Sequence, residues 1–159
     1  MQHIISCLVE NNPGVLARVA GLFSGRGYNI DSLNVAETDD PEVSGMTIVS
    51  TGDDQIIEQI LKQLHKLIDV IKVTDLTEEV HVERELVLIK IASTSRTRSE
   101  IMQIIDVFRA NIVDVDHKTM IIELVGAKAK IEGLINLLRP FGIRELNRTG
   151  RIAMVRGGR

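Results

Sequence analysis

A turn near the N-terminus holds the residues best suited to binding chemistry. It lies within "VENNPGVLARV", residues 9–19. A helix that starts near Gly14 leaves the N–H groups of Gly14, Val15 and Leu16 without intrahelical acceptors, and the helix dipole adds partial positive charge at this end. Gly14 also lets a ligand approach the backbone closely. A carboxylate fits such a position.

Two asparagines could complete a site for an α-amino acid. Asn11 precedes the turn and Asn29 follows the next helix, and each side chain offers an amide oxygen and an amide N–H2 group. The oxygens would accept from an ammonium group, while the helix N–H groups would bind a carboxylate. The alternative is structural: Asn11 and Asn12 cap the helix, and Asn29 accommodates a turn. Spacing alone favours the alternative, because caps are the commoner use of such residues.

The composition limits the classes of function. The chain has 159 residues, 44% of them apolar, which is enough for one domain or two small ones. With 19 Lys+Arg against 22 Asp+Glu the net charge is −3, so the whole chain does not attract nucleic acid or an anionic membrane. A single cysteine, Cys7, fits a reducing compartment. With no signal-peptide pattern and no apolar run of membrane-spanning length, we predict a cytoplasmic protein.

The hydrophobic periodicity gives the order β-α-β-β-α-β twice. The first predicted helix stops at Gly25 and Gly27, and the third carries a possible capping box from Thr97 to Glu100. The predicted strands are residues 3–10, 29–38, 44–52, 70–76, 86–92, 111–117, 119–126 and 143–157, and the predicted helices are residues 15–25, 53–69, 97–110 and 128–142.

This order predicts an α+β protein with two ferredoxin-like βαββαβ units in tandem, each with both helices on one face of its sheet. We place the domains at residues 1–76 and 77–159, with the boundary next to the charged segment "TEEVHVERE". The first strand has apolar residues on both faces, so the face without helices needs a cover. We therefore expect pairing between units, within or between chains, and a homodimer or higher assembly.

Longer motifs resemble a known family. The segment "LVENNPGVLARVAGLFSGRGYNIDSLNVAETDDPEVSGMTI", together with "HVERELVLIK" and the "RTGRIAMVRG" near the end, resembles the small, regulatory subunit of acetolactate synthase, also called acetohydroxyacid synthase. The resemblance covers nearly the whole chain. It implies that the first unit is an ACT domain and that the second is the C-terminal domain of the small subunit.

The resemblance also implies a function. Such subunits bind a catalytic large subunit that uses thiamine diphosphate, raise its activity, and confer feedback inhibition by a branched-chain amino acid, usually valine. The resemblance places the effector on Asn11, Gly14 and Asn29, across the interface of two paired chains. Adjacent backbone or apolar contacts would come from Val15, Leu16 and Ile30. No cofactor is expected in this chain; thiamine diphosphate, Mg²⁺ and FAD are expected on the catalytic partner.

Two other classes of function have less support. A small ferredoxin-like enzyme could use Arg18 and Asn29 near a helix N-terminus to stabilise phosphate or carboxylate chemistry. An RNA-binding module would need stacking aromatics, and three Phe, one Tyr and no Trp offer few. The histidines show no metal-ligand spacing; they are His3, His65, His81 and His117. Neither nucleic acid nor a membrane is an expected partner.

Two further features of the second half carry expectations. The segment "IASTSRTRSE" lacks a Pro-Gly turn, so we do not expect a second effector site there. Five arginines follow near the end of the chain, where they form either a docking strip for an acidic partner or a solvated tail; they are Arg144, Arg148, Arg151, Arg156 and Arg159. The sequence does not separate valine from leucine or isoleucine, because one methylene is worth only about 1–3 kcal/mol.

Overall fold

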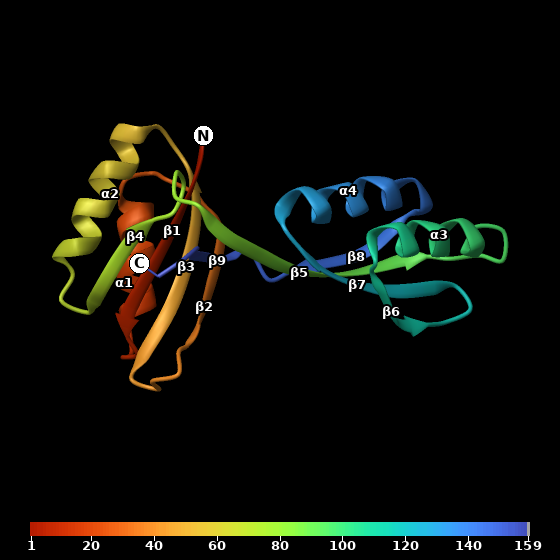
Figure 1. Ribbon diagram of the computed structural model, residues 1–159, viewed down its shortest axis with the longest axis horizontal. Coiled ribbons are helices and arrows are strands. Elements are labelled where there is room, and N and C mark those ends of the chain that lie inside the picture. The colour runs from red at the N-terminus through yellow and green to blue at the C-terminus, as the bar shows by residue number, and fades with distance from the viewer. Residues whose placement is uncertain (159) are drawn as a thin grey trace. The chain divides into compact units, whose positions relative to one another are not determined.

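The computed structural model describes residues 1–158, which form two compact units (Figure 1). The first unit contains Met1–Val82 and residues 151–158, and the second contains Glu83–Gly150. The chain therefore passes between the units twice. Each unit contains the predicted β-α-β-β-α-β order and an antiparallel sheet, so the predicted α+β, ferredoxin-like fold class is confirmed.

The first unit has one four-stranded sheet with strand order β2-β3-β1-β4, which leaves β2 and β4 at its edges. Its two helices lie on the same face of this sheet (Figure 1). Its elements are β1 (Gln2–Glu10), α1 (Val15–Gly25), β2 (Ile30–Glu37), β3 (Val43–Thr51), α2 (Asp54–Lys66) and β4 (Val70–Asp75).

Alternation along β1 builds the first core. Ile5, Cys7 and Val9 point to the helices and are almost fully buried, because successive strand residues face opposite sides of a sheet. They pack with apolar residues of the two helices and β3, which are Val15, Val19, Phe23, Met46, Ile48, Ile57, Ile60 and Leu64. This packing fixes the position of α1, and with it the glycine turn that precedes α1.

The face of the first sheet without helices is covered in part by the end of the chain. Ala153 and Val155 of β9 (Ile152–Val155) pack against a small buried cluster of Ile4, Val49 and Leu76. The predicted division placed every residue after 76 in the second domain, and the predicted strand 143–157 was continuous. Instead the strand breaks near Gly150, and β9 returns to the first unit, because its apolar side chains bury exposed surface there.

The second unit has strand order β6-β7-β5-β8. Its strand β5 begins at His81, two residues inside the first unit, and β9 of the first unit also pairs with β5. Its elements are β5 (His81–Ala92), α3 (Arg98–Phe108), β6 (Asn111–Val115), β7 (Thr119–Gly126), α4 (Lys128–Leu138), the short 3-10 helix η1 (Arg139–Phe141) and β8 (Ile143–Arg148). The core under its helices is formed by Val87, Ile89, Ile91, Ile101, Ile105, Met120, Ile122, Leu124, Ile131, Leu134, Ile135 and Leu138.

The capping box predicted from Thr97 to Glu100 does not form. Thr97 precedes α3 but has helical backbone angles, and its side chain makes no capping hydrogen bond. Its hydroxyl instead accepts the Thr94 N–H at 3.0 Å, while the Thr97 N–H donates to the Thr94 hydroxyl at 3.3 Å. Hydrogen bonds between the two threonines replace the predicted cap. Such competition is common, because hydroxyl side chains also bond to nearby backbone groups.

Candidate functional site

The glycine turn before α1 has the geometry of a binding turn. Gly14 is the N-cap residue, with φ 84° and ψ −7°, in the left-handed region that glycine adopts without strain. The first intrahelical bond runs from the Arg18 N–H to the Gly14 carbonyl at 3.0 Å. Val15 N–H donates to the Asn12 carbonyl at 3.4 Å, so the N–H groups directed out of the helix end are those of Gly14, Leu16 and Ala17 rather than the predicted Gly14, Val15 and Leu16.

The guanidinium group of Arg18 lies next to this turn. A Cβ atom added to Gly14 would come within 3.1 Å of Arg18 Nη1. The other two nitrogens of the group, Nε and Nη2, donate to Asp69 Oδ2 at 2.9 and 2.5 Å. Asp69 thus orients the cation so that Nη1 faces the turn, and this cation adds to the positive potential of the helix end. An anionic group would be favoured there.

Asn11 does not cap the helix. Its Nδ2 donates to Glu37 Oε1 at 3.2 Å and to the Pro41 carbonyl at 3.0 Å. With both amide hydrogens directed to these acceptors, the side-chain oxygen is the group that can accept from a ligand. Asn12 Nδ2 donates to Glu10, and α1 has no side-chain cap at all. The prediction that these two side chains cap the helix is therefore wrong, and ligand binding stays a hypothesis for Asn11.

Asn29 lies at the far end of β2 from this turn. It directly precedes Ile30, which pairs with Ser50, whereas Glu37 at the other end of β2 pairs with Ser44. Asn11 contacts Glu37, and eight strand residues span about 26 Å. One amino acid is far too small to bridge that distance. Within a single chain, the structure does not bring Asn29 together with Asn11 and Gly14.

The remaining predicted contacts differ in accessibility. The Val15 side chain is 3% exposed and belongs to the core, so only its backbone could face a ligand. Leu16 is 45% exposed on α1 and can contact an apolar group. Ile30 is half-buried against the core at the start of β2. The sequence did not indicate the Arg18–Asp69 pair or the Asn11–Glu37 contact, whose partners are 51 and 26 residues apart.

Family models match both units. Residues 5–72 match the ACT domain of the acetohydroxyacid synthase small subunit, and residues 84–157 match the small subunit of acetolactate synthase. A probable acetolactate synthase small subunit from Archaeoglobus fulgidus is 53% identical over 159 residues, which cover 100% of this chain and 99% of that relative. This chain belongs to the acetolactate synthase small-subunit family. The predicted resemblance is confirmed.

Two other relatives match this chain over nearly its whole length. The acetolactate synthase small subunit of Aquifex aeolicus is 52% identical over 98% of this chain and 81% of its own length. The crystal structure of the small subunit from Thermotoga maritima is 45% identical and matches with a TM-score of 0.89, covering 99% of both chains. Residues 5–72, which form most of the first unit, are thus an ACT domain of the acetolactate synthase small-subunit family.

Two further structural observations concern cofactors and membranes. Among residues 1–158, no group of three or more His, Cys, Asp or Glu side chains is arranged to hold a metal ion. None of the helices formed by these residues combines the length and apolar character needed to cross a membrane. The one cysteine, Cys7, is buried in the ACT-domain core, and burial raises its pKa to about 12.

Proposed function

We propose that this chain binds and activates the catalytic large subunit of acetolactate synthase, and that valine or another branched-chain amino acid bound to its ACT domain inhibits the complex. Family membership supports the partnership. The observation that carries the effector site is the position of its halves: Asn11 and Gly14 lie at one end of the edge strand β2, and Asn29 lies at the other.

A two-fold homodimer joins the halves. If two β2 edge strands pair antiparallel about a two-fold axis, the start of one strand lies beside the end of the other. Asn29 of the partner subunit then lies near the glycine turn, and the symmetry makes two equivalent sites. Such pairing also covers the unpaired hydrogen-bonding groups of an exposed sheet edge. Each site in this proposal uses Asn11 and Gly14 from one chain and Asn29 from its partner.

The groups at the turn match the two charges of an amino acid. The N–H groups of Gly14 and Leu16, with Arg18 Nη1, would bind the effector carboxylate. The amide oxygens of Asn11 and Asn29 would accept from its ammonium group, close to the carboxylate of Glu37. Leu16 would contact the branched side chain. The effector then stabilises the dimer arrangement in which both halves of the site meet. Inhibition follows because the bound effector favours one state of the complex over the others.

In this proposal the chain is not itself a catalyst. Thiamine diphosphate, Mg²⁺ and FAD belong to the large subunit, and the second unit helps to transmit effector binding to it. The protein works in the cytoplasm together with that subunit. Titration of the reconstituted enzyme with valine, leucine and isoleucine in turn identifies the effector.

Mixed dimers test the shared site. Gly14→Asp blocks the turn, and Asn29→Ala removes a contact of the other half, so neither homodimer should bind the effector with wild-type affinity. A mixed dimer of the two variants has one site with both defects and one site with neither. We expect calorimetry on purified, differently tagged mixed dimers to recover one effector per dimer with wild-type affinity.

The mixed dimer also distinguishes a site shared between two chains from a site within one chain. If each site lay within one chain, both chains of the mixed dimer would be defective, and no binding would return. That result would overturn the shared site. Reconstitution with the large subunit tests the function itself: acetolactate formation that neither rises with this chain nor falls with any branched-chain amino acid would contradict the proposed regulatory role.

A further inference from the structure

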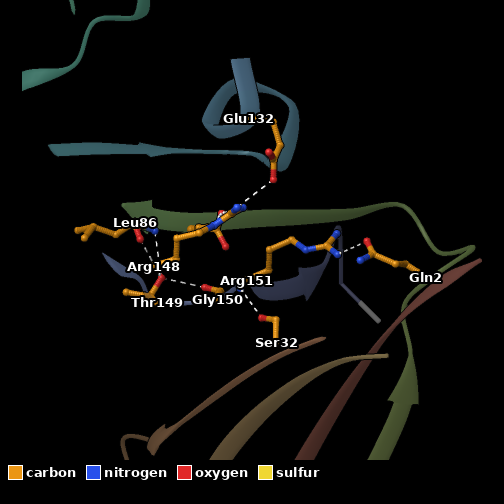
Figure 2. A network of polar contacts seen from close by, with 9 residues as sticks. Gln2, Ser32, Leu86, Glu132, Arg148, Thr149, Gly150 and Arg151 are labelled. Carbon is orange, nitrogen blue, oxygen red and sulfur yellow. Dashed lines mark hydrogen bonds and ion pairs between the residues drawn. The ribbon is translucent and has the colours of Figure 1, made fainter. Parts of the chain in front are cut away.

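The segment of residues 148–151, called the crossing segment here, leads from the second unit back to the ACT domain. It lies in the "RTGRIAMVRG" motif, to which the proposed effector site gives no role. The expectation for the basic end was either a docking strip or a solvated tail. Arg148 and Arg151 do neither, because both side chains bind groups of this chain, as Figure 2 shows. Arg159 lies outside the described residues.

Ion pairs attach the start of the crossing segment to the second unit. Arg148 Nε donates to Glu85 Oε1 at 2.9 Å, its Nη2 donates to the same oxygen, and its Nη1 donates to Glu132 Oε1 at 2.9 Å. Burial alone would lower the pKa of Arg148, but the hydrogen bonds and charges of Glu85 and Glu132 outweigh it, so the pKa is raised. Glu85 is 5% exposed, so Arg148 neutralises a buried carboxylate.

The next residue adds a second attachment to the same unit. The hydroxyl of Thr149 accepts the Leu86 N–H at 3.0 Å, and the Thr149 N–H donates to the Leu86 carbonyl at 3.0 Å. These bonds continue the pairing of β8 with β5 by one residue. Arg148 and Thr149 are therefore fixed to the sheet of the second unit.

The ACT domain holds the other end. The Arg151 N–H donates to Ser32 Oγ at 3.2 Å, and its Nη2 donates to Gln2 Oε1 at 2.7 Å (Figure 2). Arg151 is only 8% exposed. After it, β9 packs on the Ile4 cluster, and the Arg156 N–H donates to the Val80 carbonyl at 2.8 Å. Only Gly150, at φ 83°, separates the two sets of attachments.

Ser32 connects this anchor to the proposed effector site. It lies three residues after Asn29, and the pairing of β2 with β3 shifts register between Ile30 and Ser32. Asp31 at this bulge accepts from Asn29 Nδ2 at 3.3 Å and from Thr51 Oγ1 at 2.6 Å. Bulges interrupt a ladder and re-aim the strand beside functional sites. A shift of Asn29 on effector binding would therefore move Asp31 and Ser32 first.

We infer that the crossing segment is the coupling element between effector binding and the second unit, with Arg148 and Arg151 as its positioning residues. The inference rests on the proposed function. A displacement at Ser32 would reach Arg151, and only Gly150 separates Arg151 from Thr149 and Arg148 along the chain. Loss of this tight connection should leave the effector site intact and disconnect it from inhibition.

An insertion tests this without removing any contact. Gly-Gly-Ser placed between Gly150 and Arg151 lengthens the crossing segment but keeps both anchors, and such lengthening costs little stability. The same insertion between Gly157 and Gly158, beyond β9, is the matched control. Calorimetry on the isolated chains gives the effector Kd, and acetolactate formation with the large subunit gives activation and the inhibition at saturating effector.

We expect the insertion at 150–151 to keep the effector Kd and the activation within about twofold, while inhibition at saturating effector falls to under about half of the wild-type extent. The control should match wild type in all three. Ser32→Ala, which removes only the acceptor for the Arg151 N–H, should reduce inhibition in the same direction by less.

Three results would overturn the inference. Undiminished inhibition in the 150–151 insertion shows that coupling runs elsewhere. Loss of effector binding in that variant, with the control intact, shows that the segment builds the site and does not couple it. A wild-type chain that binds no branched-chain amino acid overturns the proposed function, and the inference with it, and is recognised before any variant is compared.

Discussion

Helix α1 of the ACT domain begins at a glycine in the left-handed region, whereas α3, at the same place in the second unit, begins at Thr97 in the right-handed region. In the turn before α3, polar groups of the same unit bond to one another. Thr94 and Thr97 form hydrogen bonds with each other. Arg98 donates to the Ser93 hydroxyl and to two carbonyls after β6. The turn before α1 has no side-chain cap and leaves N–H groups directed outward.

The rest of the two units is closely matched. A residue with positive φ follows each of these helices: Gly27 comes two residues after the end of α1, and Arg109 comes directly after α3. An asparagine then opens the next strand region, Asn29 in the ACT domain and Asn111 in the second unit. Both strands have a register shift near their start. The comparison shows that the fold alone does not make a binding site; the few side chains of one turn decide whether a helix end is open.

The largest expected effect comes from closing the open turn. Gly14→Asp places a carboxylate where the effector carboxylate would bind, and it would face Arg18. We expect effector affinity to fall by at least about 100-fold while activation of the large subunit is retained. The measurement is acetolactate formation against effector concentration.

Two controls keep that result specific. Thr97→Asp puts the same charge at the start of α3, where we expect no change in effector response. Gly142→Asp, at φ 97° in the second unit, places aspartate at another glycine with positive φ, away from the turn. Full inhibition in the Gly14→Asp variant would show that the open turn does not bind the effector.

The paired asparagines give the second test. Asn29→Ala removes a hydrogen bond to a charged group of the effector, worth about 1.5–3 kcal/mol, so affinity should fall by about one to two decades. Asn111→Ala, at the matching place, should leave the effector Kd unchanged. Calorimetry on the isolated chains measures both. Equal losses in the two variants would mean that the asparagines act on folding instead of binding.

The third test compares the two cores. Cys7 lies in the middle of β1, and Ile89 has the corresponding position in β5 of the second unit. Burial raises the pKa of Cys7 from 9.0 to about 12. The unfolded chain loses this proton at about pH 9 and the folded chain keeps it, so the free energy of unfolding should fall as pH rises from about 9 toward 12. The slope is about 1.4 kcal/mol per pH unit, a tenfold change in the unfolding constant.

Urea unfolding of wild type and Cys7→Ala at pH 8, 9.5 and 10.5, at one protein concentration, isolates this effect, since the two proteins differ only at this residue. The variant should lose less stability over this range. Identical slopes would mean that the folded thiol ionises like the unfolded one.

The smallest effect is expected at the arginines of the two turns. Arg18 is 48% exposed in its ion pair with Asp69, so solvent screens its charge. Arg18→Met should weaken effector binding by no more than about fivefold and should reduce the salt dependence of the Kd. Arg98→Met in the second unit should change neither. A larger effect of Arg98→Met would place an effector contact in the second unit after all.

The sequence predicted the element order because apolar periodicity is set locally, as along Ile5, Cys7 and Val9 in β1. It also predicted the open glycine turn, since few residues but glycine adopt the conformation of Gly14. The capping box at Thr97 was wrong because Thr94, three residues earlier, competes for the same hydroxyl.

Long-range features could not be predicted in this way. Gly150 is a local sign that the predicted strand 143–157 is interrupted, but nothing local indicates that β9 then covers Ile4 and Leu76. The distance between Asn29 and the turn depends on strand order, which periodicity does not fix. The buried Arg151 looks like any other basic residue near a chain end until its contacts with Gln2 and Ser32 are known.

The return of β9 to the ACT domain also affects when that domain can be completed. Arg151 follows Leu76 by 75 residues, so the ribosome makes the cover for the Ile4 cluster long after the strands it protects. At about 5–20 residues per second, the delay is about 4–15 s, much longer than the collapse of a small domain. During translation the first sheet therefore exposes apolar surface, and a nascent chain stalled before residue 151 should be a better chaperone substrate than one stalled after β9.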